Sequence, residues 1–405
     1  MNVPLGTGTI DVSLSDCSVD VATPAGGDPV AVRPTSESAF ADPHGPSLAD
    51  IVAPDDTVSI VVTDITRATP DDVLVDVLLD RLQQCGVARE QVSIVVGLGL
   101  HRPMDTDELA ASLGPHADLA ANHDPDRTVT VGQVDGVDIE IHEAVAAADR
   151  VLATGMVEPH QYAGFSGGAK TVVIGAGGES QIGYTHGPDL LSADGVRLGR
   201  IENNPFRAFL DRAGDLAGPD FCLNVTHGPQ GVLGVEAGDP RAVVRALADT
   251  AREALEVEVE DGYDAVIAGV GAPKDANLYQ ASRGATYVAL GDHNPLGDEG
   301  RIVVPAALPE GAGDGTGEQR FQRWLTSAID ADSLYEQMRQ GYEPGAQRAF
   351  VLARVLRDHD VWITNSQHPD LVEDCLMHAA ESPETAIEPG SEVLVVPDAI
   401  NTLLG

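Results

Sequence analysis

Short apolar runs alternate with amphipathic stretches along most of the chain. In the first half this pattern predicts strands at 56–63, 91–97, 150–153 and 171–174, and helices at 71–85, 106–113 and 242–255. A proline at position 70 directly precedes the first of these helices, as expected for a helix start. Strand, helix and strand at this spacing predict a parallel sheet covered by helices.

The same pattern begins again after the charged run at 256–261. It predicts strands at 264–269, 301–304, 360–364 and 392–396, and helices at 277–286, 320–328 and 348–357. We therefore expect an α/β protein of two α/β domains with mainly parallel sheets, covering residues 1–260 and a Rossmann-like 261–405. Residues 1–50 are rich in Gly, Pro and Asp and predict strands and loops that lead into the first domain.

Composition narrows the class of protein. The chain has 405 residues, 43% of them hydrophobic, which is enough for two or three domains with their own cores. We expect no transmembrane helix, because no run of 18 apolar residues is present, and no signal peptide, because the first residues lack its pattern. Four widely spaced cysteines without a CxxC motif indicate free thiols in a reducing cytoplasm: Cys17, Cys85, Cys222 and Cys375.

The net charge of −40 is better explained by adaptation to a salt-rich solvent than by a charged binding partner. The acidic residues are spread along an otherwise apolar-rich chain, which argues against an acidic disordered tail. Capture of a cationic partner stays open, but no acidic run marks a site for one. We favour a halophilic surface, because at 1 M salt a Debye length of about 3 Å screens self-repulsion. So negative a chain is not expected to bind nucleic acid.

Lysine is almost absent, and this makes one lysine informative. Only Lys170 and Lys274 occur, beside 22 arginines (24 basic residues minus two). Lys170 ends a Gly-Gly-Ala-Lys turn. A primary amine can be covalently modified or can act as a base once it is desolvated, whereas a guanidinium group does neither well. The retained amine therefore predicts a chemical role for Lys170.

Two further motifs follow predicted strands of the first domain. Asp64, Thr66 and Arg67 stand between a strand and a helix, where Arg67 can bind a carboxylate or phosphate. The alternative is that Asp64 or Thr66 serves only as a turn and helix cap. His101 lies in a Gly-rich turn after the next strand and is a candidate acid–base residue at the same sheet edge, or else a surface histidine.

The segment around Lys170 allows other interpretations. It nearly spells a phosphate-binding P-loop, but Ala169 stands where that motif has glycine, which leaves an NTPase as a minor alternative. His160 and His186 together could bind a metal, although no third ligand stands nearby in the sequence. In the second domain, Gln280 and Arg283 are three residues apart and share a helical face that can cover the first-domain site; the alternative is a solvated helix start.

Taken together, these motifs resemble the nickel-pincer-nucleotide-dependent lactate racemase family. The matching pieces run in order from 64 to 284: Asp-x-Thr-Arg at 64–67, Gly-Leu-His-Arg-Pro at 99–103, Glu-Pro-His-Gln-Tyr-Ala-Gly-Phe-Ser-Gly-Gly-Ala-Lys at 158–170, Thr-His at 185–186, Asn-Pro at 204–205 and Asn-Leu-Tyr-Gln-x-x-Arg-Gly at 277–284. The resemblance implies an active-site cleft between the two domains, with the first as the cofactor-binding domain.

The resemblance also implies the cofactor. This would be the nickel pincer nucleotide (pyridinium-3,5-bisthiocarboxylic acid mononucleotide nickel), linked covalently to Lys170, with His186 as the protein ligand of nickel. Other residues that the resemblance assigns to cofactor binding are Thr66, Gly167, Gly168 and Tyr279. The implied reaction is racemisation of a small 2-hydroxy acid, lactate by default, by reversible hydride transfer through a flat keto acid.

In this reaction His101 and His160 would serve as the two bases, one for the hydroxyl group of each enantiomer. Arg67 and Arg283 would hold the substrate carboxylate, Gln280 would orient the substrate, and Asp64 would fix Arg67 or contact the cofactor. Expected partners are the small 2-hydroxy acid and cofactor-biosynthesis proteins, with no membrane and no nucleic acid.

Two positions depart from the family pattern. Arg283 stands where lactate racemases carry lysine, and Ala169 stands where family members often have arginine. Arg283 favours a different carboxylate-bearing substrate, such as malate or a gluconate-type sugar acid, or reflects a general replacement of lysine in a halophile. A non-catalytic nickel or nucleotide carrier is the alternative from another class, but a carrier needs no acid–base pair.

Overall fold

The computed structural model describes all 405 residues, which form two compact units, each built from separate segments of the chain. The amino unit consists of residues 26–185 and 201–254, and the carboxy unit of residues 1–25, 186–200 and 255–405. The chain passes for the last time from one unit to the other between Ala254 and Leu255. The helices are all too short or too polar to cross a membrane. All four cysteines are free thiols, as predicted.

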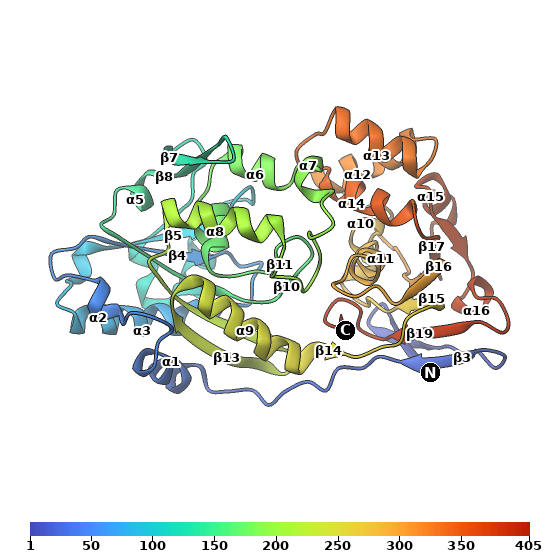
Figure 1. Ribbon diagram of the computed structural model, residues 1–405, viewed down its shortest axis with the longest axis horizontal. Helices are drawn as coiled ribbons and strands as arrows, with labels where there is room; N and C mark the ends of the chain where they lie inside the picture. Colours follow the sequence, from blue (N-terminus) through green and yellow to red (C-terminus); the bar gives the residue numbers. More distant parts are fainter. The chain divides into compact units, whose positions relative to one another are not determined.

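The amino unit contains a six-stranded sheet in the order β13-β12-β9-β4-β5-β6, of which Figure 1 labels β13, β4 and β5. Neighbouring strands are parallel except β12 and β13, which are antiparallel. The strands are β4 (Val58–Thr63), β5 (Val92–Gly97), β6 (Ala120–Asn122), β9 (Arg150–Met156), β12 (Phe221–Gly228) and β13 (Gly231–Gly238), with hairpins β7 (Thr128–Val134)/β8 (Val137–His142) and β10 (Pro159–His160)/β11 (Gly164–Phe165). Its helices are α1 (Val32–Ala41), α2 (Leu48–Ile51), α3 (Asp71–Gln84), α4 (Thr106–Leu113), α5 (Glu143–Ala146), α6 (Glu179–Thr185), α8 (Pro205–Ala217) and α9 (Pro240–Leu255).

Helical segments cover both faces of this sheet, which explains why its central strands read as continuous apolar runs. Successive residues of a strand point to opposite faces. On β9, Thr154 bonds the side chain of Asp71 on α3, whereas a Cβ at the next residue, Gly155, would lie 2.9 Å from the hydroxyl oxygen of Thr171. The helix α3 and the segment that follows Lys170 therefore pack on opposite faces.

The prediction of a strand at 171–174 is wrong. Thr171–Gly175 forms a single turn of π-helix, η3, whose Thr171, Val172 and Val173 are buried. A short apolar run has the same pattern in a buried strand and in a buried helical turn, so periodicity could not separate them. Single π turns are often found at functional sites.

The carboxy unit contains a second six-stranded sheet, all parallel, in the order β18-β17-β16-β15-β19-β3. The strands are β3 (Ser18–Val21), β15 (Tyr263–Ala268), β16 (Leu296–Pro305), β17 (Val361–Thr364), β18 (His378–Ala380) and β19 (Glu392–Val396), with the pairs β1 (Asn2–Leu5)/β2 (Gly8–Asp11) and β14 (Glu256–Val257)/β20 (Leu403–Leu404). Its helices are α7 (Pro188–Leu191), α10 (Leu278–Ala281), α11 (Arg283–Ala289), α12 (Thr316–Ser327), α13 (Ala331–Gln340), α14 (Gln347–Leu356), α15 (Pro369–Asp374) and α16 (Pro383–Ala386).

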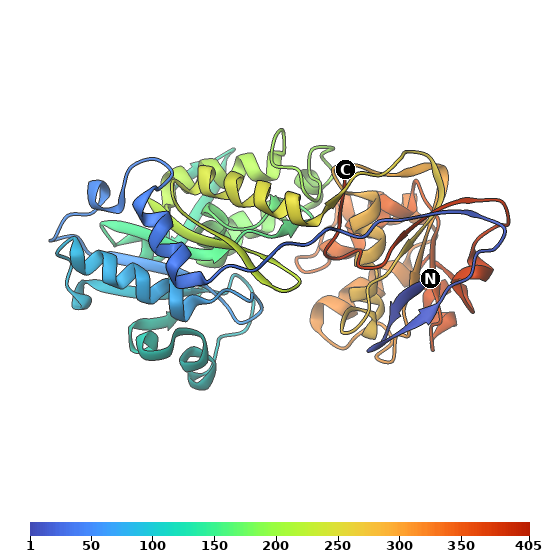
Figure 2. The same ribbon diagram turned by 90° about the horizontal axis from the view of Figure 1, so that it is seen from below.

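The first 50 residues differ from the prediction. The blue N-terminal strands lie with the orange and red strands of the carboxy unit in both views (Figures 1 and 2), and β3 adds to the sheet beside β19. The helices α1 and α2, which the Gly- and Pro-rich composition did not suggest, then begin the amino unit. The predicted helix at 277–286 is divided into α10 and α11 at Ser282. The predicted α/β class with mainly parallel sheets is confirmed.

One carboxyl group lies inside the amino unit without a cation. Asp71, the first residue of α3, is 2% exposed and accepts hydrogen bonds from the hydroxyl groups of Thr63 and Thr154. Burial raises the pKa of Asp71 to about 7, although these hydrogen bonds act in the opposite direction. Because its ordinary pKa is near 4, the folded state binds this proton more tightly than the unfolded chain.

This difference predicts a pH-dependent stability. The contribution of Asp71 to the free energy of unfolding falls as pH rises from about 4 to about 7, and Asp71→Asn, which resembles the neutral acid, should remove that fall. Relative to wild type, the variant should gain up to about 4 kcal/mol between pH 4 and pH 8, from about 1.4 kcal/mol per pKa unit. Urea unfolding at several pH values measures this, with Asp107→Asn, an exposed carboxylate on α4 that does not influence Asp71, as the control. An equal difference between variant and wild type at every pH would contradict it.

Candidate active site

The carboxyl ends of β4 and β5 bring two of the predicted motifs together. Asp64 directly follows β4, and His101 lies four residues beyond the end of β5, the parallel neighbour of β4. The Nδ1 atom of His101 lies 2.6 Å from Oδ2 of Asp64. Asp64 is 6% exposed, whereas 58% of the His101 side chain is exposed. An anchored carboxylate thus holds an accessible imidazole, at the sheet edge where ligands of parallel α/β sheets bind.

The hydrogen bonds around Asp64 determine whether its carboxyl group is ionised and which ring nitrogen of His101 carries the proton. Burial opposes ionisation of Asp64, but hydrogen bonds from His101 and from Thr66 outweigh it and lower the pKa of the carboxyl group. The main-chain N–H of Thr66 donates to Oδ1 over 2.9 Å, and its hydroxyl group donates to the same atom. An ionised Asp64 accepts the Nδ1 proton of His101, which leaves the Nε2 lone pair of a neutral His101 to accept another proton.

Glycines let the His101 turn approach the segment after Lys170. A Cβ atom at Gly97 would lie 3.0 Å from the Cα atom of Gly175, the last residue of η3. The N–H of Gly99, which has a φ of +56°, donates to the carbonyl oxygen of Gly175 over 2.8 Å. The turn that carries His101 and the turn that begins after Lys170 therefore fix each other.

Arg67 has an acidic partner that sequence analysis did not assign. Its Nη1 atom bonds Oε1 of Glu158, which follows β9. About one third of each side chain is exposed, 35% for Arg67 and 31% for Glu158. Glu158 stands in the most informative motif of the chain, so the signal was present, but only the pairing of β4 with β9 places it beside Arg67.

A glycine turn positions Lys170. Gly167 and Gly168 have φ values of +78° and +58°, and a Cβ atom at either would approach a valine methyl group to within 2.7 Å. The N–H of Gly168 donates to Oδ1 of Asn224, a fully buried residue of β12, over 2.9 Å. Asn224 was also missed, because an asparagine inside an apolar strand has no distinguishing local signal. Only glycine fits this turn, since both the backbone conformation and the close packing exclude a side chain.

The amine of Lys170 has lost much of its hydration. Desolvation is the largest cause that lowers its pKa to about 7, and the positive charges of Arg67 and Arg207 act in the same direction. The carboxylates of Glu158 and Asp64 act in the opposite direction. The residue as a whole is only partly buried, which keeps it within reach of a small ligand. About half of the Lys170 amines are therefore unprotonated and nucleophilic near pH 7.

His160 has the opposite hydrogen-bond pattern to His101. Its Nδ1 atom accepts from the main-chain N–H groups of Tyr162 and Ala163, over 3.3 and 3.2 Å. In the neutral imidazole this leaves the proton on Nε2. The ring also contacts the rings of Tyr162 and Phe206, at centroid distances of 5.6 and 6.3 Å. The fold therefore holds one histidine with a proton at Nδ1 and the other with a proton at Nε2.

The remaining predicted site residues belong to the carboxy unit. The side chain of Asn277 caps α10 by accepting the N–H of Gln280 over 3.0 Å. Tyr279 packs edge-on against Phe321, with the guanidinium group of Arg348 over its ring at 4.6 Å. Oε1 of Gln280 is buried without a hydrogen-bond partner, so it can accept a hydrogen bond from a bound ligand. Arg283 begins α11, and His186 lies between α6 and α7.

The surroundings of Lys170 differ from those of a P-loop. In a P-loop the glycine-rich turn connects a sheet strand directly to a helix. Here the short hairpin β10/β11 intervenes between β9 and Lys170, and the turn leads into the five residues of η3. No group of three or more His, Cys, Asp or Glu side chains is arranged to hold a metal ion.

Two protein-family models match the chain, one in each half. The family model of the lactate racemase N-terminal domain matches residues 5–198, and that of the lactate racemase C-terminal domain matches residues 259–403. The chain is 28% identical to lactate racemase of Lactiplantibacillus plantarum over 394 residues, which cover 91% of this chain and 90% of that protein. It is 26% identical to lactate racemase of Thermoanaerobacterium thermosaccharolyticum over 379 residues, which cover 88% and 86%.

Two solved structures share the fold. The lactate racemase apoprotein of Thermoanaerobacterium thermosaccharolyticum superposes with a TM-score of 0.86 at 24% identity, covering 100% of this chain and 99% of that one. A protein from Thermotoga maritima superposes with a TM-score of 0.66 at 16% identity, covering 94% and 99%. With both domain models matched in order along its length, the chain belongs to the lactate racemase family, which confirms the isomerase class expected from its sequence.

Proposed function

We propose that this protein interconverts the two enantiomers of lactate, using a nickel pincer nucleotide bound covalently through Lys170. The observation that carries the proposal is the desolvated Lys170 amine, which interacts electrostatically with both Arg67 and Asp64. Asp64 is in turn hydrogen-bonded to His101, which adds an acid–base residue to these side chains. A nucleophilic amine, a carboxylate-binding guanidinium and an imidazole with an accessible Nε2 are the groups that this chemistry needs.

The residues of the chain fit the cofactor. An amine with a pKa of about 7 can attack an electrophilic carboxyl derivative at neutral pH, whereas an ordinary lysine amine is almost entirely protonated. His186 would supply the imidazole ligand to a nickel ion whose other donors belong to the nucleotide. When bound, this cofactor supplies a reversible hydride acceptor for C2 of a 2-hydroxy acid, which avoids a carbanion at a weakly acidic carbon.

The side chains of the protein bind the substrate and move its hydroxyl proton. Arg67 binds the substrate carboxylate, with Glu158 holding the guanidinium in place. Nε2 of His101 takes the hydroxyl proton of one enantiomer, and the ionised Asp64 stabilises the imidazolium that results. His160 serves the hydroxyl group of the other enantiomer, with Nε2 as the atom that exchanges the proton. For Gln280 and Arg283, in the carboxy unit, we propose the roles that the family resemblance implies for them, orientation of the substrate and binding of its carboxylate.

Arg283 is the reason to test other substrates. A planar guanidinium donates two parallel hydrogen bonds to a carboxylate, whereas a lysine ammonium acts as a point charge. A second carboxylate or a longer polar chain on the substrate could use this difference. Malate and gluconate-type acids are therefore the alternative substrates.

The function can be tested on protein purified at high salt from a host that makes the cofactor. We expect a nucleotide-sized mass adduct on the peptide that contains Lys170, about one nickel per chain, and conversion of either lactate enantiomer into the other. Lys170→Ala should lack the adduct, the nickel and the activity. Unmodified Lys170 without nickel, in protein from such a host, would favour a binding protein without catalysis. If malate or gluconate is converted faster than lactate, that acid is assigned as the substrate in place of lactate.

The Asp64–His101 pair gives a second prediction. Asp64→Asn should lower kcat/KM by about 10²- to 10⁴-fold, because the uncharged amide neither stabilises an imidazolium nor enforces a proton at Nδ1 of His101. Chiral chromatography of lactate measures the rate, and Asp72→Asn, an exposed carboxylate on α3, is the control. A loss of less than about threefold in a correctly folded variant would show that Asp64 does not orient the base.

The scarcity of lysine allows the state of Lys170 to be measured directly. Protein without cofactor, reacted briefly with a small amine-modifying reagent at a series of pH values, is digested and modification is quantified at Lys170 and at Lys274. We expect the modification of Lys170 to reach half of its maximum near pH 7, because only the unprotonated amine reacts. A midpoint near 10, the ordinary value for lysine, would mean that the amine is fully hydrated and is not prepared for attachment.

A further inference from the structure

The first turn of α8 holds the loop that joins His160 to Lys170. Asn204 caps this helix, because its Oδ1 atom accepts the N–H groups of Phe206 and Arg207 over 2.9 and 3.3 Å. Its Nδ2 atom donates to the carbonyl oxygen of Tyr162 over 2.8 Å. One side chain therefore fixes both the start of the helix and a point of the loop.

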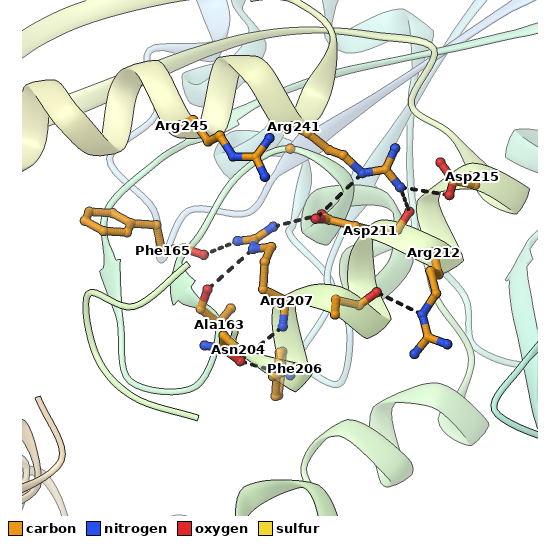
Figure 3. Close-up of polar contacts among 12 residues, drawn as sticks. Ala163, Phe165, Asn204, Phe206, Arg207, Asp211, Arg212, Asp215, Arg241 and Arg245 are labelled. Atoms are coloured by element: carbon orange, nitrogen blue, oxygen red, sulfur yellow. Dashed lines mark hydrogen bonds and ion pairs between the residues drawn. The ribbon is translucent and has the colours of Figure 1, made fainter. Parts of the chain in front are cut away.

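Arg207 extends the same attachment from within the protein. It is 3% exposed, and its guanidinium group points into the loop (Figure 3). Nε donates to the carbonyl oxygen of Ala163 over 3.4 Å, and Nη2 donates to that of Phe165. Nη1 lies 3.8 Å from Oδ1 of Asp211, one turn along α8. A buried arginine is uncommon, and here two of its three guanidinium nitrogens donate to main-chain carbonyl groups of one loop.

The held carbonyl groups determine how the loop presents His160. Carbonyl oxygens of Tyr162, Ala163 and Phe165 are bonded by α8, while the N–H groups of Tyr162 and Ala163 bond Nδ1 of His160. The peptide group between Tyr162 and Ala163 is thus bonded at its oxygen by Asn204 and at its nitrogen by His160. The orientation of the imidazole is therefore connected to α8 through the main chain.

The helix that carries Arg207 also packs against the residue before Lys170, since a Cβ atom at Gly214 of α8 would lie 2.6 Å from the Cβ atom of Ala169. Desolvation is the largest cause of the lowered pKa of the Lys170 amine; the charges of Arg67 and Arg207 lower it further, and the carboxylates of Glu158 and Asp64 raise it. Burial lowers the pKa of Arg207 itself, but a guanidinium group remains protonated in proteins. The Asp211 carboxylate is shared, since Arg241 lies 3.7 Å from its other oxygen, as Figure 3 shows. The positive charge of Arg207 is therefore permanent and only partly compensated.

We propose that Arg207 is a positioning residue for both reactive groups of this loop: it holds the main chain that orients His160, and it keeps a fixed positive charge within electrostatic reach of the Lys170 amine. The inference rests on the proposed function only for the roles of His160 as a base and of Lys170 as the site of cofactor attachment. A cation near an amine favours the unprotonated amine, which is the form that can be attached to a cofactor.

The test compares three variants as protein without cofactor. Arg207→Met removes the charge but keeps an unbranched stem, and the Asp211 carboxylate that it leaves behind retains Arg241 as a cation. Because one partner of a buried pair is lost, the variant is expected to be less stable than wild type. Arg207→Lys keeps the charge and loses the planar donors. Arg212→Met is the matched control on the same helix, where a half-exposed arginine pairs with Asp135 over 2.7 and 2.6 Å. Modification of Lys170 is measured against pH, with Lys274 as the internal reference and thermal unfolding as a check on folding.

The expected result is specific to charge. In Arg207→Met the midpoint for Lys170 should rise by about one pH unit, which means about tenfold less unprotonated amine at pH 6. Arg207→Lys should stay within about half a unit of wild type, and Arg212→Met should be unchanged. A folded Arg207→Met with the wild-type midpoint, or an Arg207→Lys shifted as far as Arg207→Met, would overturn the electrostatic part. Arg207→Gln replaces the methionine variant if that variant does not unfold cooperatively.

Hydrogen exchange tests whether Arg207 holds the main chain that orients His160. The amides of Tyr162 and Ala163 should exchange at least about tenfold faster in Arg207→Met than in Arg212→Met, because the loop loses its attachment. Equal protection in the two variants would overturn the positioning of His160. These outcomes are separate from the proposed function, since a wild-type Lys170 midpoint near 7 without any nickel adduct in the loaded protein would contradict only the latter.

Discussion

The candidate site of the amino unit is organised around one electrostatic constraint: desolvation and the charges of two arginines oppose protonation of the Lys170 amine. Such an arrangement costs free energy, because an ammonium group is better solvated in water. It persists because the turn around Lys170 is fixed by contacts that involve no charge. Gly167 and Gly168 adopt backbone conformations that only glycine adopts easily, and Asn224 binds the turn from a strand inside the sheet.

The parallel sheet explains how residues far apart in sequence surround this amine. The strands β4, β5 and β9 end at one edge, so Asp64, His101 and Glu158 follow neighbouring strands. The side chain of His101 pairs with that of Asp64, and the side chain of Glu158 pairs with that of Arg67. The acidic partners hold the cationic and basic groups in place, and their own negative charges moderate the effect of the arginines on Lys170.

The two histidines show how local hydrogen bonds give one residue type two different states. The carboxylate of Asp64 accepts the proton at Nδ1 of His101, whereas two main-chain donors at Nδ1 of His160 place the ring proton on Nε2. A racemase needs one group to receive a proton while another is able to supply one, so unequal surroundings suit a pair of this kind. Arg207 and Asn204 connect the surroundings of His160 to α8, which makes the helix part of the site without touching a substrate.

The sequence by itself determined the α/β class, because continuous apolar runs separated by amphipathic stretches admit few other folds, and it selected the candidate site residues by their types. It selected Lys170 because lysine is otherwise almost absent, and His101 because a glycine-rich turn follows a strand. The tertiary structure decided what local pattern leaves undetermined. An apolar run at 171–174 became a π turn, the first strands joined the sheet of the carboxy unit, and Glu158, Asn224 and Arg207 became neighbours of the site. The reason is physical: burial, charge proximity and strand pairing depend on residues distant in sequence, whereas propensity and spacing record only near neighbours.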